Sequence, residues 1–70
     1  MYVDGLKIET MLAERYMSKK DYAACSGVSR QNISAIIRRG SCEPRTAGKL
    51  AAGLGVPVLE IVRKEAQRDE

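Results

Sequence analysis

Three glycines divide this chain into segments too short for any long helix. Gly27, Gly40 and Gly55 each follow a short segment of helix-forming composition. Glycine adopts the left-handed backbone conformation at no steric cost, so it commonly stands just after the last turn of a helix. The spacing therefore predicts several short helices separated by tight turns.

The starts of these helices carry capping signals as well. Asp4, Ser18 and Ser29 are candidate N-caps, and Pro44 suits the first turn of a helix. The expected helices span about residues 5–16, 19–26, 30 to 38 or 39, and 44–54, and a fifth begins at Pro57 and carries Leu59, Ile61 and Val62.

The start of the second helix has three agreeing signals. Ser18 is followed three residues later by Asp21, a variant of the capping box. Met17 and Tyr22 occupy the two positions of a hydrophobic staple. We therefore expect the helix to begin directly after Ser18.

The chain is predicted to be a single all-α domain. Ile8, Met11 and Leu12 follow helical spacing, whereas no stretch alternates apolar and polar residues as a strand does. Seventy residues allow one small core. We expect a compact domain of four to five helices over residues 1–63 and a charged C-terminal tail over residues 64–70.

Composition excludes several classes of protein. Hydrophobic residues make up 44% and charged residues 30% of the chain, a globular balance. The apolar stretches are far shorter than the roughly 20 residues of a membrane span, and the N-terminus lacks the pattern of a signal peptide. We expect a cytoplasmic protein with no membrane partner.

The two cysteines and the absence of histidine argue against a metal site and against catalysis. Zinc usually takes four Cys or His ligands, and histidine is the commonest general base. The chain also lacks a glycine-rich phosphate loop, so we expect no enzyme, no cofactor and no small-molecule ligand. Cys25 is expected to be a small packing residue and Cys42 to lie in an exposed turn, with a disulfide or a redox switch as the alternative.

Two further glycines, Gly48 and Gly53, lie inside the predicted fourth helix. Each costs up to about 1 kcal/mol relative to alanine in that position. Close packing against another helix would explain at least one of them.

Charge is distributed unevenly along the chain. Residues 18–49 have a net charge of +5, whereas the segments before and after them each have a net charge of −1. A basic middle between slightly acidic ends suits a face that meets a polyanion. The alternative is an ordinary solvated face.

The segment from Lys19 to Arg38 has the residues that two helices joined by a tight turn require. A small residue, Ala23, stands where the helices would touch, and Gly27 can form the turn. Apolar anchors follow in the turn and in the second helix: Val28, Ile33 and Ile36.

This segment resembles the helix-turn-helix of the phage repressor and Cro proteins. The stretch SKKDYAACSGVSRQNISAII at residues 18–37, Glu43-Pro44-Arg45, and KLAAGLGV at residues 49–56 are similar to that family's pattern. The resemblance covers about residues 5–62 and implies a lambda-repressor-like domain whose third helix enters the DNA major groove. The interval from Ile33 to Pro44 is one residue longer than the usual pattern.

The helical period also predicts which side chains of the third helix point outward. With Ile33, Ile36 and Ile37 inward, the outer side holds Arg30, Gln31, Ser34, Ala35 and Arg38. Arg can donate two hydrogen bonds to guanine, Gln can pair with adenine, and Ala can contact a thymine methyl group. The resemblance implies base contact for Arg30 and Gln31 first, and then for Ser34, Ala35 and Arg38.

Phosphate contacts are expected beside this face. Lys19 and Arg45 match positions that contact phosphate in the family. Ser29 and Asn32 have side chains that can hydrogen-bond the DNA backbone. Arg39 is a further candidate, with the alternative that it only complements the dipole at the helix C-terminus.

These features together predict a sequence-specific transcriptional regulator, a repressor, that binds double-stranded DNA. A single domain of this size makes a small interface, so a homodimer on a palindromic operator is expected. We expect the dimer interface at Leu59, Ile61 and Val62. The alternative is a protein-interaction module, such as an antitoxin or an accessory factor of a mobile element.

Overall fold

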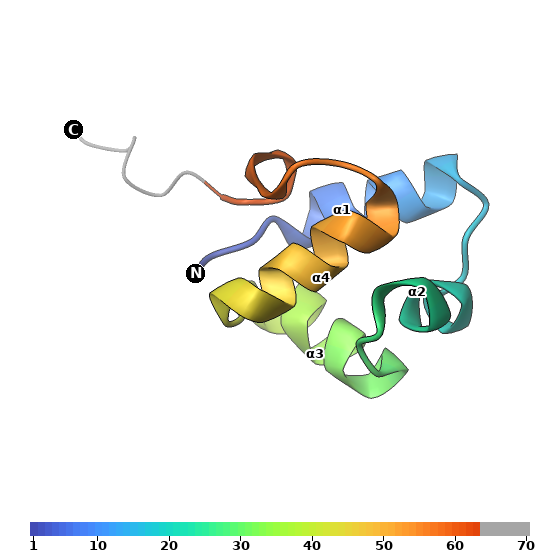
Figure 1. The fold of residues 1–70 in the computed structure, drawn as a ribbon, viewed down its shortest axis with the longest axis horizontal. Coiled ribbons are helices and arrows are strands. Elements are labelled where there is room, and N and C mark those ends of the chain that lie inside the picture. The colour runs from blue at the N-terminus through green and yellow to red at the C-terminus, as the bar shows by residue number, and fades with distance from the viewer. Residues whose placement is uncertain (64–70) are drawn as a thin grey trace.

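The structure, a computed structural model, describes residues 1–63 of the chain, and the charged tail predicted for residues 64–70 lies outside this part. Four α-helices and one 3₁₀ turn follow one another along the chain (Figure 1): α1 (Gly5–Glu14), α2 (Lys19–Ser26), α3 (Arg30–Arg39), α4 (Pro44–Leu54) and η1 (Val58–Glu60). The all-α prediction is confirmed. None of the described helices is long and apolar enough to cross a membrane.

The predicted caps form at the starts of the first three helices. The Asp4 carboxylate accepts a hydrogen bond from the Lys7 backbone N–H, and the Ser29 hydroxyl accepts one from Asn32 N–H. The capping box at α2 is complete, because Ser18 and Asp21 each accept the other's backbone N–H at 3.1 Å. These caps explain why the helix starts were predictable from local sequence.

The end of α1 differs from the prediction. The helix ends at Glu14, and Tyr16 adopts a left-handed conformation with φ of 53°. Tyr16 N–H donates to Ala13 O, and Met17 N–H donates to Leu12 O. This is a Schellman motif with tyrosine at the position where glycine is usual, so the local sequence contains no signal for the end of the helix.

The prediction of a fifth α-helix is wrong. The chain makes only one 3₁₀ turn after Pro57, at Val58–Glu60. The residues that follow pair with the N-terminal segment instead: Asp4 N–H donates to Ile61 O at 2.8 Å, and Val62 forms an antiparallel bridge with Val3. That pairing takes the backbone of Ile61 and Val62 out of any continuing helix.

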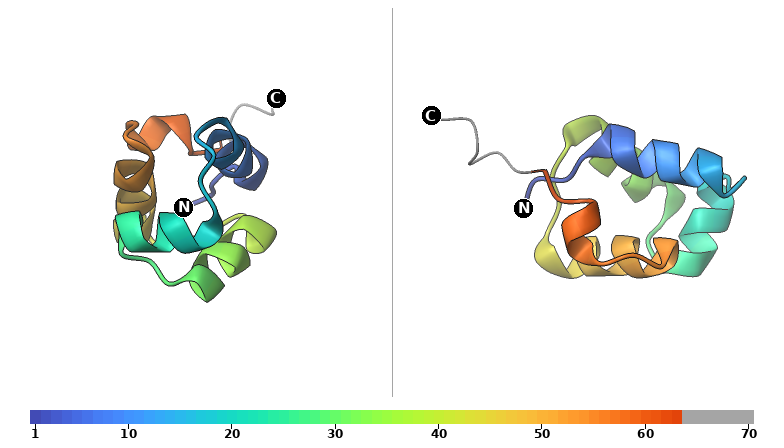
Figure 2. Two further views of the ribbon diagram at one scale, coloured as in Figure 1. Left: turned by 90° about the vertical axis from the view of Figure 1, so that its right-hand side faces the viewer. Right: turned by 90° about the horizontal axis from the view of Figure 1, so that it is seen from above.

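The N-terminal segment lies between two segments that are distant in sequence. On one side Val3 N–H donates to Gly40 O and Cys42 N–H donates to Met1 O, both at 3.0 Å. On the other side Arg63 N–H donates to Tyr2 O. Figure 2 shows this first segment beside the chain that leaves η1. The N-terminus is therefore tied to both the end of α3 and the end of the described chain.

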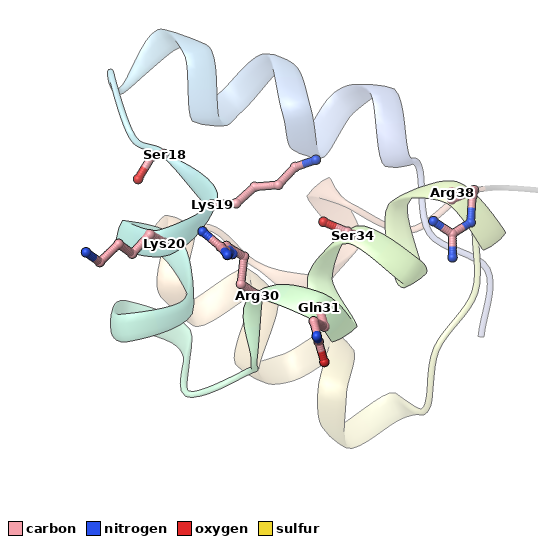
Figure 3. Close-up of a pocket in the computed structure, with 7 residues that line it drawn as sticks. All are labelled: Ser18, Lys19, Lys20, Arg30, Gln31, Ser34 and Arg38. Atoms are coloured by element: carbon pink, nitrogen blue, oxygen red, sulfur yellow. The ribbon is translucent and has the colours of Figure 1, made fainter.

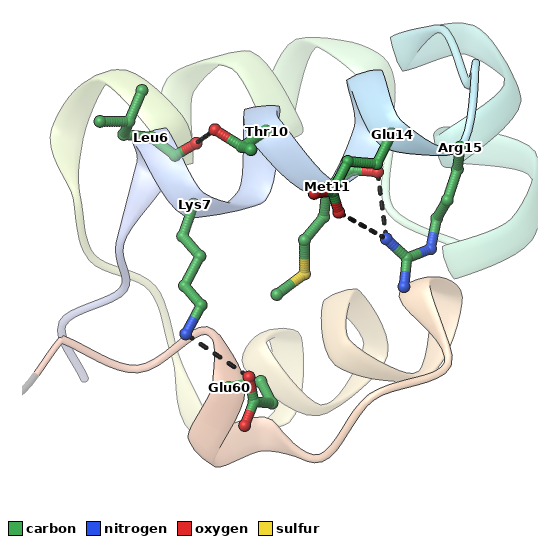
Figure 4. Close-up of polar contacts among 7 residues, drawn as sticks. All are labelled: Leu6, Lys7, Thr10, Met11, Glu14, Arg15 and Glu60. Atoms are coloured by element: carbon green, nitrogen blue, oxygen red, sulfur yellow. Dashed lines mark hydrogen bonds and ion pairs between the residues drawn. The ribbon is translucent and has the colours of Figure 1, made fainter.

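The core lies between the four helices (Figure 2). The Tyr22 ring is fully buried in it, and its hydroxyl donates a hydrogen bond to Leu50 O of α4. On the outside, Lys7 Nζ lies 3.5 Å from a carboxylate oxygen of Glu60 and links α1 to η1 (Figure 4). The buried apolar residues are Val3, Ile8, Met11, Leu12, Tyr22, Val28, Ile33, Ile36, Ala47, Leu50, Ala51, Leu54 and Ile61.

One of the two glycines inside α4 is explained by helix packing. A Cβ at Gly53 would lie 2.9 Å from Ser26 Cβ and 2.9 Å from Tyr22 Cε1, so α2 and α4 approach too closely for any side chain there. A Cβ at Gly48 would meet nothing within 4 Å. Close packing therefore requires Gly53 and does not require Gly48.

The environments of the two cysteines are opposite to those expected. Cys25 is exposed rather than packed, and Cys42 is half-buried against the core rather than free in the turn. Cys42 is drawn inward because its N–H pairs with the carbonyl of Met1. Burial raises the pKa of the Cys42 thiol.

Candidate nucleic-acid interface

The turn between α2 and α3 is fixed by a short chain of local interactions. Gly27 has φ of 79°, in the left-handed region, and its N–H donates to Ala23 O. Val28 is buried in the core, and its N–H donates to the Ser26 hydroxyl. Ser29 then caps α3. The turn is anchored on both sides, so the start of α3 has a defined position relative to α2.

The helix α3 has one buried side and one outer side. Ile33 and Ile36 are each 1% exposed, and Ile37 packs against the core from the edge. The side chains predicted to point outward do so to different degrees: Arg30, Gln31 and Arg38 are exposed, whereas Ser34 and Ala35 are half-buried. The outer side can present polar groups to a partner along the length of the helix.

A groove runs between the N-terminus of α2 and the outer side of α3 (Figure 3). Its volume is about 610 Å³, and it is lined by Ser18, Lys19, Lys20, Arg30, Gln31, Ser34 and Arg38. Every one of these residues is exposed or half-buried, and none is acidic. We call this surface the basic groove. It brings four cationic side chains from two helices onto one surface.

The structure brings together four of the five residues predicted to contact bases. Arg30, Gln31, Ser34 and Arg38 all line the basic groove, whereas Ala35 does not. Arg30 and Gln31 occupy the first turn of α3, at the positive end of its dipole. The first turn of α3 therefore presents Arg30 and Gln31 to the groove, and Arg38 adds a further donor near the other end of the helix.

The five residues predicted to contact phosphate do not form one cluster. Lys19 lines the basic groove, whereas Asn32 and Arg39 line a second, smaller hollow of about 270 Å³ between α3 and the start of α4. Arg39 Nε donates to Ser41 O at 3.2 Å. Ser29 and Arg45 are exposed and line neither hollow.

Sequence reasoning missed two residues of the basic groove, Ser18 and Lys20. Lys19 and Lys20 occupy the first two positions of α2, where backbone N–H groups have no acceptor within the helix. The position of Lys20 near a predicted helix start was the signal that could have indicated its place in the groove. Anions are favoured at such a terminus by both the side chains and the dipole.

Asp21 follows Lys20 in the sequence, and its carboxylate accepts a hydrogen bond in the capping box of α2. The Ser18 backbone N–H and, secondarily, the Ser18 hydroxyl hold the pKa of the Asp21 carboxyl below its usual value of 3.8. Asp21 is therefore ionised at neutral pH, and its charge is directed to the start of α2.

The predicted dimer interface is only partly at the surface. Leu59 is 73% exposed, but Ile61 is fully buried in the core of its own chain and Val62 is half-buried beside Val3. Ile61 faces inward because the chain turns toward the N-terminal segment after η1. The prediction is wrong for Ile61, since a partner could reach it only if the core opened.

Within residues 1–63, no three Cys, Asp or Glu side chains gather where a metal ion could be held. Comparisons of the chain with protein-family models, with curated proteins and with solved structures find no match.

Proposed function

We propose that this chain binds double-stranded DNA, with α3 in the major groove and the N-terminus of α2 on the phosphate backbone. The observation that supports this is the basic groove, in which Lys19, Lys20, Arg30 and Arg38 converge with Gln31. An α-helix with its side chains is about 10–12 Å wide, and the major groove is about 12 Å wide. The outer side of α3 suits this space.

The two helices that line the groove offer two kinds of recognition. Arg30 can donate two hydrogen bonds to guanine, and Gln31 can donate one to adenine and accept one from it, so they are the proposed base contacts. Lys19 and Lys20 lie at the positive end of α2, which favours a phosphate group. Phosphate contacts would position the domain, and base contacts would select the sequence.

The size of the groove alone would also fit a small molecule, since such sites measure about 300–1,000 Å³. Small-molecule sites, however, are lined mainly by buried apolar side chains. The residues that line the basic groove all have cationic or polar side chains, and each of them is exposed or half-buried. An open surface with four cations favours an extended polyanion over a small ligand.

The arrangement agrees with the resemblance to the phage repressor and Cro proteins. We propose a transcriptional regulator, a repressor, that acts in the cytoplasm at the nucleoid and binds a palindromic operator as a homodimer. A single module of this kind covers only about 600–1,000 Å² of protein surface on DNA, so two modules are needed for tight binding.

A salt titration tests DNA binding directly. Lys20→Ala removes a groove cation, and Lys49→Ala, at an exposed position of α4 that lines neither hollow, is the matched control. We expect the affinity of the wild type for a duplex to fall steeply with salt, and Lys20→Ala to reduce the slope of log K against log salt by about 0.9.

Lys49→Ala should leave that slope close to the wild-type value. A wild-type affinity that does not change with salt, or equal slopes for the two variants, would contradict DNA binding through the basic groove. Binding to a protein instead would then be the better explanation of this surface.

A further inference from the structure

One cation of the basic groove already has an acidic partner within the chain. Lys19 Nζ lies 3.6 Å from a carboxylate oxygen of Glu9, which belongs to α1. The two side chains are 38% and 47% exposed, respectively, so solvent reaches the pair. In Figure 3 the Lys19 side chain extends toward α1, away from Lys20.

This pairing distinguishes Lys19 from the other groove cations. Within residues 1–63, Lys20, Arg30 and Arg38 form no ion pair with a carboxylate. Part of the positive charge that the groove presents is therefore neutralised from outside it. Glu9 does not line the groove, but its charge lies at the edge of it.

The free energy of the Glu9–Lys19 ion pair determines whether a phosphate group can displace the carboxylate. An exposed ion pair is worth about 0–1 kcal/mol, so a phosphate group can displace the carboxylate from Lys19. The exchange costs the free energy of the Glu9–Lys19 pair, and this cost weakens binding.

We propose that Glu9 is an intramolecular competitor for Lys19 and limits the sequence-independent affinity of the domain for the DNA backbone. This inference rests on the proposed function, and it adds a residue of α1 that acts through Lys19 rather than by contacting DNA.

The test compares two charge-neutralising variants. Glu9→Gln removes the competitor and keeps the size of the side chain. Glu60→Gln is the matched control, because it changes the net charge equally and breaks a similar exposed pair, with Lys7 at 3.5 Å (Figure 4). Neither Lys7 nor Glu60 lines the basic groove. The probe is a labelled DNA duplex of about 20 base pairs, long enough for two half-sites.

We expect Glu9→Gln to bind the duplex about 3-fold more tightly than Glu60→Gln at roughly 50 mM salt, and equally tightly near 200 mM. The slope of log K against log salt should become steeper by up to about 0.9, because salt weakens the Glu9–Lys19 pair in the wild type and so reduces its competition with phosphate as salt rises. In a Lys19→Gln background the same Glu9→Gln change should have no effect on affinity.

Three outcomes would overturn the inference while DNA binding stands. These are equal affinities of Glu9→Gln and Glu60→Gln, an effect of Glu9→Gln that persists without Lys19, or weaker binding by Glu9→Gln. Failure of the wild type itself to bind the duplex would overturn the proposed function and this inference together.

Discussion

At the scale of single residues, Gly53 decides how closely α2 and α4 approach. The contacts that a side chain at this position would make are with Ser26 and Tyr22, and the Tyr22 hydroxyl is bonded to Leu50 O of the same α4. The tyrosine therefore cannot move away without losing a buried hydrogen bond. Gly48, in the same helix, has open space instead.

These two positions form a matched pair for a stability measurement. Gly53→Ala should destabilise the fold by about 1–3 kcal/mol through overpacking. Gly48→Ala should stabilise it by about 0.5–1 kcal/mol, because alanine loses less conformational entropy in a helix than glycine does. Urea denaturation measures both, and changes of the same sign would contradict the packing of α2 on α4.

Single residues also mark the limits of prediction from the sequence. Gly27, Gly40 and Gly55 were recognised as helix ends because glycine is the usual residue in the left-handed conformation. Tyr16 adopts the same conformation and was not recognised, because tyrosine carries no such signal. The burial of Cys25 and Cys42 was predicted incorrectly, since it depends on segments distant in sequence.

At the scale of elements, α2, its turn and α3 were the most predictable part of the chain. Their boundaries are set by Ser18, Gly27, Ser29 and Gly40, which act on residues a few positions away. The 3₁₀ turn η1 was not predictable in this way. The chain after it pairs with Val3 and Asp4, and no local pattern near Pro57 contains that information.

The same distinction applies to the basic groove. The outer residues of α3 could be predicted from the helical period. Four of the five residues predicted in this way line the groove. The contribution of Lys20 could not be predicted, because it depends on how α2 is packed beside α3. The ion pair between Glu9 and Lys19 could not be predicted either, because it depends on where α1 lies relative to α2.

The capping box of α2 should give the fold an acid-sensitive contribution. The pKa of Asp21 is lowered in the folded state by the hydrogen bonds from Ser18, so the ionised form stabilises the fold. That contribution is complete well above the usual pKa of 3.8 and is lost as the pH falls below it, through the folded-state pKa.

We therefore expect Asp21→Asn to be less stable than the wild type at neutral pH, with a difference that shrinks as the pH falls below 3.8. Urea midpoints measured along a pH series test this. Glu43→Gln, at the N-cap of α4 where no side-chain cap bond forms, is the control and should stay near the wild type. A difference for Asp21→Asn that does not change with pH would contradict the assigned role of the carboxylate.

At the scale of the whole molecule, the N-terminal segment connects α3, which lines the basic groove, to the rest of the fold. It pairs with the backbone of Gly40 at the end of α3 and with Ile61 after η1. Val3 is fully buried between them. The end of α3 is thus held by the N-terminal segment, which is itself paired with the residues that follow η1.

We propose that the homodimer expected for operator binding forms through a surface near η1. Leu59 is the exposed apolar residue there, and Leu59→Arg should give a monomer with weaker operator affinity, because a buried unpaired charge disfavours the interface. Sedimentation measures the change. Leu6→Arg, at a similarly exposed leucine of α1, is the control and should leave the dimer intact. An unchanged sedimentation coefficient for Leu59→Arg would place the interface elsewhere.

The central claim is that the outer side of α3 reads the sequence of a DNA duplex. Selection of bound duplexes from a random pool tests this most directly, with the wild type and Arg30→Ala compared. We predict a palindromic consensus for the wild type, with half-sites about one helical turn apart, and loss of preference at one base pair of each half-site for Arg30→Ala. A wild-type pool without enrichment, or the same consensus from both proteins, would contradict the claim.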